Sequence, residues 1–216
     1  MFMEKGLLVT GEIYHVFTKS IAGFRIFNDS AEFLRMIETI RYYQRKAQSI
    51  RLSRFNNLKD QDKLEIDEGE KLIEIIAYCL MPTHLHLVLK QLIDKGVSTG
   101  MNNILNSYSR YFNIRHNRKG PLWEGRFKRV LVKSDEQLLH LTRYVHLNPV
   151  TAYLVDKPTD WTASSYKEFI GKNNIEKRIC EYKDILNIES DSYKDFVEDR
   201  ISYQRELAKI KDLILE

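Results

Sequence analysis

Two histidines separated by one leucine are the most chemically informative feature of the sequence. His84 and His86 lie in an apolar segment that continues through Leu87-Val88-Leu89. Successive side chains on a strand alternate between its faces, so both imidazoles point to one side while Leu85 points to the other. Two imidazoles one strand repeat apart can hold one divalent metal ion. The pattern alone leaves open the alternative that both histidines face solvent or a hydrogen-bond partner.

A second informative segment spans residues 142–150 and carries a tyrosine and an asparagine. On a helix, Tyr144 and Asn148 lie one turn apart and share a face. A phenolate beside a metal site can attack a phosphorus atom, and an amide oxygen can serve as a third, neutral ligand. Two imidazoles and an amide would leave the ion its full charge, which suits polarisation of a phosphodiester. Without that context, a tyrosine at this position is more typical of a hydrophobic core.

Basic and aromatic side chains alternate between these two segments. Guanidinium and ammonium groups neutralise phosphates, and an exposed indole can stack on an unpaired base. The alternative is a solvated basic surface with the tryptophan as a core residue. The residues that we predict to contact nucleic acid are Arg110, Arg115, Arg118, Lys119, Trp123, Arg126, Lys128 and Arg129.

The composition is that of a globular protein with an anionic partner. A chain of 216 residues can form one domain with a substantial core, or one domain with an appendage. The formal net charge is +4, which favours binding to an anionic molecule. Residues 171–216 carry 9 Lys/Arg and 11 Asp/Glu, so the excess of positive charge lies within residues 1–170.

The sequence gives no indication of a membrane protein or a secreted one. No apolar run is long enough to span a bilayer, and the N-terminal residues are too few and too acidic for a signal peptide. Cys79 and Cys180 offer neither zinc-ligand spacing nor a disulfide framework. We therefore expect a cytoplasmic protein.

The order of predicted elements is typical of an α+β domain. Asp29 or Ser30 can begin a first helix, and Ser134 with Gln137 forms a capping box for the last one. We expect a glycine-containing break at 96–100, a helix end at Pro149, and a loop or surface helix at 49–70. This order favours a mostly antiparallel sheet with helices on its face, similar to ferredoxin. The predicted strands span 11–18, 72–80, 84–90 and 127–133, and the helices 30–48, 101–116 and 135–148.

Three segments together resemble the REP-associated tyrosine transposases. These belong to the single-tyrosine HUH (IS200-like) transposases, named for a histidine–hydrophobe–histidine strand. The resemblance covers roughly residues 8–170, and Thr83 departs from it by replacing the usual asparagine before the first motif histidine. The three segments are residues 77–87, residues 111–113 with 120–128, and residues 144–150.

The resemblance implies both a fold and an activity. It implies an HUH transposase/nuclease domain at 1–170, followed by a charged helical extension at 171–216. It also implies cleavage of single-stranded DNA beside a hairpin formed by a REP-like palindrome. The reaction passes through a 5′-phosphotyrosine intermediate, leaves a free 3′-hydroxyl, and serves DNA transposition and recombination.

The resemblance also assigns roles to residues of the chain. His84, His86 and Asn148 become ligands of Mg²⁺ or Mn²⁺, and Tyr144 becomes the nucleophile. Without the family pattern, Tyr108 and Tyr111 are equal candidates for that role. The proton of the phenol has no evident acceptor, with His146 or a water as the options.

Two other functions compete with this interpretation. A basic, aromatic sheet could bind a structured nucleic acid without cutting it. A small zinc-dependent hydrolase would need a carboxylate near the histidine pair, for which Glu12 and Asp94 are the candidates. The sequence leaves open whether the protein is a monomer or a homodimer.

Overall fold

The protein is built on a four-stranded antiparallel sheet with the strand order β2-β3-β1-β4. The computed structural model describes residues 7–46, 50, 52–59, 62, 69–173 and 178–214. This strand order, with one helix after β1 and another after β3, is the ferredoxin-like arrangement and confirms the predicted α+β class. The strands are β1 (Ile13–Lys19), β2 (Ile73–Met81), β3 (His84–Gln91) and β4 (Lys128–Leu131).

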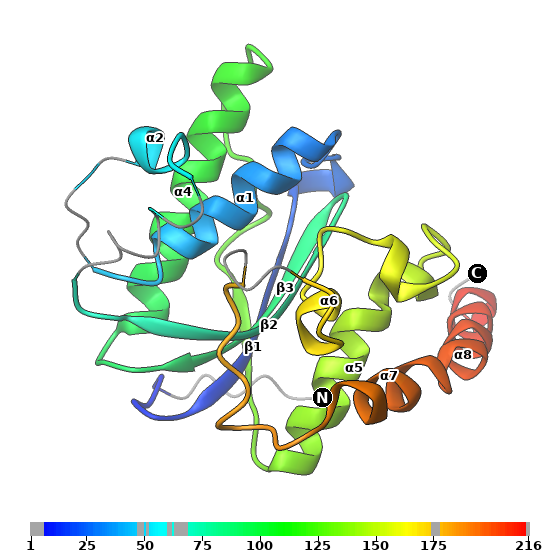
Figure 1. The fold of residues 1–216 in the computed structure, drawn as a ribbon. Coiled ribbons are helices and arrows are strands. Elements are labelled where there is room, and N and C mark those ends of the chain that lie inside the picture. Colours follow the sequence, from blue (N-terminus) through cyan, green and yellow to red (C-terminus); the bar gives the residue numbers. More distant parts are fainter. Residues whose placement is uncertain are drawn as a thin grey trace.

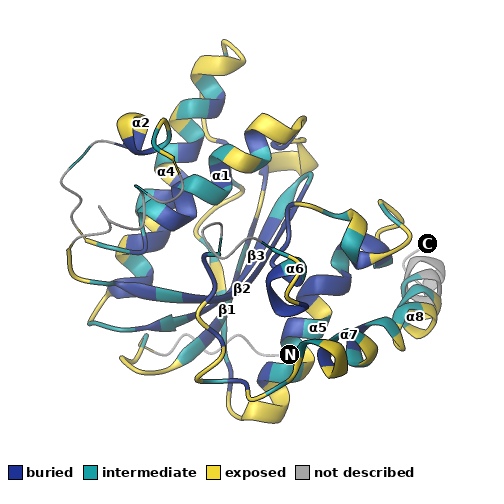
Figure 2. Ribbon diagram, in the orientation of Figure 1, coloured by how far each residue is buried: buried dark blue, intermediate teal, exposed yellow. Residues whose placement is uncertain are grey.

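Helices cover the two faces of this sheet in separate layers (Figure 1). The first layer contains α1 (Ser30–Tyr42), α2 (Leu52–Phe55) and α4 (Gly96–Arg115). The strands between the layers are mostly buried, and the outward sides of the helices are exposed (Figure 2). The second layer contains α5 (Asp135–Thr151), α6 (Tyr166–Phe169), α7 (Ser190–Glu198) and α8 (Ile201–Ile214). Two short 3₁₀ turns are η1 (Ile21–Gly23) and η2 (Pro158–Asp160).

The predicted helix starts are confirmed by their caps. Asp29 begins α1, and its side chain accepts a hydrogen bond from the backbone N–H of Glu32 at 3.0 Å. Ser134 begins α5 as the capping box predicts, because its hydroxyl accepts from the backbone N–H of Gln137 at 3.1 Å. The end of α1 at Tyr42 comes earlier than expected. Much of the segment 49–70 lies outside the described residues, and α2 is its one described helix.

The predicted break at residues 96–100 is wrong, because these residues form the first turns of α4. A Cβ atom at Gly96 would collide with the carbonyl oxygen of Leu72. One at Gly100 would press on the side chain of Ile73, with 3.1 Å between carbon atoms. The two glycines therefore allow α4 to approach β2 closely, and they do not interrupt the helix.

The predicted helix end at Pro149 is also wrong, because α5 continues to Thr151. Proline removes the N–H group that would otherwise bind the carbonyl oxygen of Val145. The side chain of Asn148 donates to that oxygen at 3.5 Å and to the carbonyl oxygen of Tyr144 at 3.1 Å. The freed carbonyl group is thus partly satisfied from within the helix, which tolerates the proline.

The C-terminal extension packs against the rest of the protein. Its Cys180 forms a parallel bridge with Ile75 of β2, and Tyr193 of α7 is fully buried. Tyr182, Leu186, Tyr193 and Val197 belong to the same hydrophobic cluster as the sheet. Among the described helices, none combines the length and apolar content needed to cross a bilayer.

Candidate functional site

The two histidines of the sequence motif lie on the face of β3 that α5 partly covers. Their ring centroids are 5.1 Å apart. Leu85 and Leu87 point to the opposite face and are fully buried, as the strand alternation predicts. His86 is 7% exposed, whereas His84 is partly open to solvent. The apolar face of β3 therefore fixes the strand that carries both imidazoles.

Helix α5 places Tyr144 beside these histidines. The centroid of its ring lies 5.8 Å from that of His86, and the side chain remains 44% exposed. The alternative Tyr108 lies on α4, across the sheet, where it is fully buried and donates to the carbonyl oxygen of Ile26. Tyr111 lies on the same helix and packs against Tyr108. Of these three tyrosines, the fold brings Tyr144 to the histidine pair.

A third histidine, His15 on β1, completes the cluster, although the sequence analysis gave it no role in the site. Its Nε2 lies 2.9 Å from Nδ1 of His86, and the two rings stack with 5.2 Å between centroids. Its centroid is 6.2 Å from that of Tyr144. Alternation along β1 puts His15 on the same face as Phe17, which was a usable signal. The pairing of β1 with β3, which brings His15 to His86, could not be derived from spacing.

The three imidazoles are held in their neutral form. Burial lowers the pKa of His15 to about 4. Burial, assisted by the positive charge of Lys19, lowers the pKa of His84 to about 4. Burial and then the neighbouring His15, His84 and Lys19 lower the pKa of His86 to about 2. Neutral imidazole is the form that can bind a metal ion, so protonation would not prevent these residues from doing so at neutral pH.

The second ring nitrogen of each motif histidine faces a partner. Nδ1 of His84 lies 3.0 Å from the hydroxyl oxygen of Thr83, and Nδ1 of His86 faces His15. Such contacts leave Nε2 as the nitrogen that could bind a ligand. The residue that departs from the family pattern, Thr83, thus still offers a hydrogen-bonding group to the first motif histidine.

Tyr144 is a neutral phenol at neutral pH. Burial raises its pKa, and hydrogen bonding from the Asn148 side chain partly offsets that rise. Asn148 is half-buried one turn further along α5. The phenol would therefore have to lose its proton as it reacts, rather than before.

His146 is not placed to accept that proton, because it is fully buried and both ring nitrogens are engaged. Its Nδ1 lies 2.7 Å from the hydroxyl of Tyr193, and its Nε2 lies 2.7 Å from the hydroxyl of Ser165. Ser165 in turn accepts from the backbone N–H of Tyr78 on β2 at 2.9 Å. His146 therefore anchors α5 to the sheet and to α7, and so fixes the position of Tyr144.

A cavity of about 240 Å³ adjoins the histidine cluster along β1 and β4. Its position follows from the strand register, in which Phe17 pairs with His86 and Lys19 pairs with His84. Arg126 and Lys128, both predicted to contact nucleic acid, line it together with Lys19 and Glu124. Three cations and the carboxylate of Glu124 thus line a cavity whose wall includes Phe17, the ring that stacks with His86.

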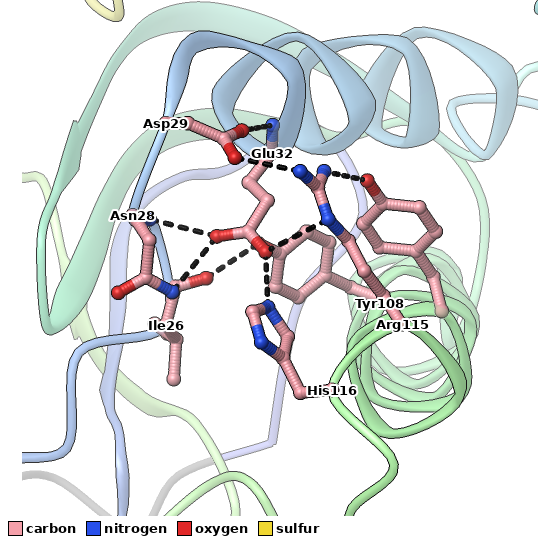
Figure 3. Close-up of polar contacts among 8 residues, drawn as sticks. Ile26, Asn28, Asp29, Glu32, Tyr108, Arg115 and His116 are labelled. Atoms are coloured by element: carbon pink, nitrogen blue, oxygen red, sulfur yellow. Dashed lines mark hydrogen bonds and ion pairs between the residues drawn. The ribbon is translucent and has the colours of Figure 1, made fainter.

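Two other predicted DNA contacts are engaged within the protein. Arg115 donates to Asp29 at 2.6 Å and to the hydroxyl of Tyr111 at 2.6 Å. It also approaches Glu32, a fully buried carboxylate that links α1 to α4 (Figure 3). Arg118 donates to the side chain of Asn113 and to two loop carbonyl groups. Both arginines therefore stabilise the end of α4 and the loop that follows it.

The remaining predicted contacts are dispersed. Arg110 lines a groove with Arg35 and Tyr111 in the α1/α4 layer, on the opposite side of the sheet from Tyr144. Trp123 is half-buried, and its indole N–H donates to the carbonyl oxygen of Leu105 at 3.2 Å. Lys119 is exposed in the loop after α4, and Arg129 lies on β4.

Glu12 and Asp94, the two carboxylates considered for a zinc site, do not lie near the histidine pair. In the part of the chain that the structure describes, no three His, Cys, Asp or Glu residues are grouped to hold a metal ion. Glu12 precedes β1 and Asp94 follows β3, so both lie at the end of the sheet opposite His84. A third ligand from the protein would thus be an amide, and Asn148 is placed on the helix that carries Tyr144.

Comparison with known proteins agrees with this geometry. Residues 56–148 match the family described as IS200-like transposases. A Haemophilus influenzae protein named as a REP-associated tyrosine transposase is 29% identical in a 104-residue alignment that covers 43% of this chain. The match covers 58% of that relative, so the chain spans little more than half its length.

A solved structure, described as a REP-associated tyrosine transposase bound to a REP hairpin, shares the fold. It superimposes with a TM-score of 0.53 at 16% identity, over 82% of this chain and 90% of the other. The matched family region ends at Asn148 and includes β2, β3, α4, β4 and most of α5. The chain is thus similar in sequence to the IS200-like transposases over residues 56–148, and similar in fold to the solved REP-associated transposase over most of its length.

Proposed function

We propose that the protein is a single-stranded DNA endonuclease and strand transferase that acts beside hairpins. The observation that carries this proposal is the contact of Tyr144 with a cluster of neutral histidines, which Phe17 separates from a cavity lined by basic residues. The relatives named as tyrosine transposases support the same reaction class.

The histidine cluster fits a divalent ion such as Mg²⁺ or Mn²⁺. His84 and His86 share one face, are neutral at neutral pH and have Nε2 atoms not taken by Thr83 or His15. Asn148 would add a neutral oxygen ligand. A bound ion would supply electrophilic polarisation of the scissile phosphate.

The protein's own residues would carry out the bond exchange. The hydroxyl oxygen of Tyr144 attacks the phosphorus atom and forms a phosphotyrosine bond. The bond from phosphorus to the 3′-oxygen breaks, the phenol gives up its proton, and the leaving oxygen takes one up as a 3′-hydroxyl. One phosphodiester replaces another, so a later 3′-hydroxyl can reverse the step and join a new strand.

The cavity beside β1 and β4 would hold the single strand. Lys19, Arg126 and Lys128 can neutralise phosphates there. Because Phe17 lines the same cavity and stacks near His86, it offers an aromatic surface to an unpaired base. The strand would then pass between the basic edge of the sheet and Tyr144.

A non-catalytic hairpin-binding module is the competing function. The internal pairing of Arg115 and Arg118 gives the loop after α4 a fixed shape, which either function could use to bind a hairpin. The two functions differ in whether Tyr144 forms a covalent bond.

A gel assay separates them. The protein is incubated with single-stranded hairpin oligonucleotides from the flanks of its own gene, in Mn²⁺ or in EDTA. We expect a metal-dependent cleavage product with wild type and with Tyr203→Phe, a half-exposed tyrosine on α8, and none with Tyr144→Phe. Hairpin binding without cleavage by wild type would favour the binding module.

A further inference from the structure

His15 and His86 share a single hydrogen between two ring nitrogens. Nε2 of His15 and Nδ1 of His86 are 2.9 Å apart, on neighbouring strands and 71 residues apart in the chain. A hydrogen bond between two ring nitrogens at this distance requires one nitrogen to donate and the other to accept. Which nitrogen donates decides what the opposite side of His86 can do.

The two arrangements have opposite consequences for a ligand. If His86 donates from Nδ1, its Nε2 carries a free lone pair. If His15 donates from Nε2, the hydrogen of His86 must lie on its own Nε2, which then cannot bind a cation. The hydroxyl of Thr83 differs from His15 because it rotates, so it can donate to or accept from His84 equally well.

We propose that His15 is a positioning residue that accepts the Nδ1 hydrogen of His86 and thereby keeps Nε2 of His86 open to a divalent ion. This inference rests on the metal site of the proposed function. His86 is 7% exposed, so without His15 its Nδ1–H group would lose a partner that water cannot readily replace. His15 would thus act through His86 without touching the ion.

The packing around the pair supports a fixed orientation. The two rings stack with an angle of 20° between their planes, and Phe17 packs against both of them. The ring of Tyr144 stands in a T-shaped arrangement to both imidazoles. A phenyl ring in place of His15 would keep these ring contacts and remove the acceptor alone.

Metal affinity tests the proposal apart from cleavage. Binding of Mn²⁺ is measured by calorimetry and electron paramagnetic resonance on wild type, His15→Phe, His15→Gln and His84→Ala. We expect His15→Phe to weaken Mn²⁺ binding by about 10- to 100-fold, the range seen when a ligand loses its outer partner. His15→Gln places an amide oxygen as acceptor and should recover most of the affinity. The exposed His140→Phe, also a histidine-to-phenylalanine change, should leave the affinity unchanged.

A second measurement needs no variant. Long-range ¹H–¹⁵N spectra of the metal-free wild-type protein report which ring nitrogen of each histidine carries the hydrogen. We expect His86 to carry it on Nδ1. A hydrogen on Nε2 of His86 would overturn the proposal, whatever the variants do.

The outcomes distinguish this inference from the proposed function. Loss of Mn²⁺ binding in His84→Ala with unchanged affinity in His15→Phe would keep the metal site and overturn the role of His15. A loss in His15→Phe as complete as in His84→Ala, without recovery in His15→Gln, would make His15 a ligand and also overturn it. Absence of Mn²⁺ binding by wild type would remove the metal site itself, and with it this role of His15.

Discussion

The phenol ring of Tyr144 stands at 87° to the imidazole ring of His86, with 5.8 Å between their centroids. One ring comes from α5 and the other from β3, so the distance and angle between the two rings depend on how the helix is attached to the sheet. The buried contacts of His146 to Ser165 and Tyr193 supply that attachment. The candidate nucleophile is thus positioned by a polar network on the opposite side of its own helix.

Because His146 attaches α5 to the rest of the protein, we expect its substitution to lower the free energy of unfolding strongly. Replacing His146 with alanine leaves a cavity and removes one hydrogen bond from each of two buried hydroxyl groups. We expect a loss of about 2–4 kcal/mol in the free energy of unfolding, measured with urea. Tyr193→Phe removes one of the hydrogen bonds and should cost about 1–2 kcal/mol. The exposed His140→Ala serves as the control, and an equal effect there would contradict the assignment.

The same histidine predicts a dependence of stability on pH. Burial lowers the pKa of His146 to about 3, whereas in the unfolded chain it stays near 6.5. Below pH 6.5 the unfolded state therefore binds a proton that the folded state excludes, so stability falls with falling pH. The contribution of His146 should decline by about 2 kcal/mol between pH 7.5 and pH 5.

Urea unfolding at several pH values in wild type and His146→Leu measures this effect. The difference between the two proteins should shrink as the pH falls from 7.5 to 5, because leucine excludes no proton. Parallel curves would show that His146 does not stay neutral in the folded protein.

The basic cavity predicts salt-dependent DNA binding. Arg126→Ala with Lys128→Ala should weaken binding of a single-stranded oligonucleotide, because both cations line the cavity. If each neutralises one phosphate, the slope of log affinity against log salt should fall by about 0.7 per residue. Fluorescence anisotropy at several salt concentrations measures the slope. Lys183→Ala removes an exposed lysine far from the cavity and should leave it unchanged.

The proposed roles of Asn148 and Tyr144 predict different effects on Mn²⁺ binding and on DNA cleavage. We expect Asn148→Ala to weaken both Mn²⁺ binding and DNA cleavage, because it would remove a ligand oxygen. Tyr144→Phe should retain Mn²⁺ binding and lose cleavage. Asn102→Ala, an exposed site on α4, is the matched control. If Asn148→Ala binds Mn²⁺ as tightly as wild type, the residue is not a ligand.

Local signals in the sequence predicted much of the fold. Ser134 and Gln137 mark the start of α5 because a capping box depends on residues three apart. The error at Gly96 has a tertiary cause, because this glycine is needed for close approach to Leu72, far from it in the sequence. The error at Pro149 has a local cause, because the preceding Asn148 bonds the carbonyl group that the proline frees.

The site was predictable to a similar extent. Strand alternation placed His84 and His86 on one face, and helical spacing linked Tyr144 to Asn148. His15 could not be found in this way, because it meets His86 through the pairing of strands far apart in sequence. The sequence likewise identified the basic residues but not which of them are available to DNA. Arg115 is bound by Asp29 within the protein, whereas Lys128 lines the cavity.

The most direct test of the central claim is identification of the residue that becomes attached to DNA. The protein is incubated with Mn²⁺ and a hairpin oligonucleotide, digested with a protease, and the DNA-linked peptide is sequenced by mass spectrometry. The account predicts a nucleotide attached to the hydroxyl oxygen of Tyr144, and no such peptide in EDTA. Attachment at another tyrosine such as Tyr111, or cleavage without any covalent peptide, would contradict it.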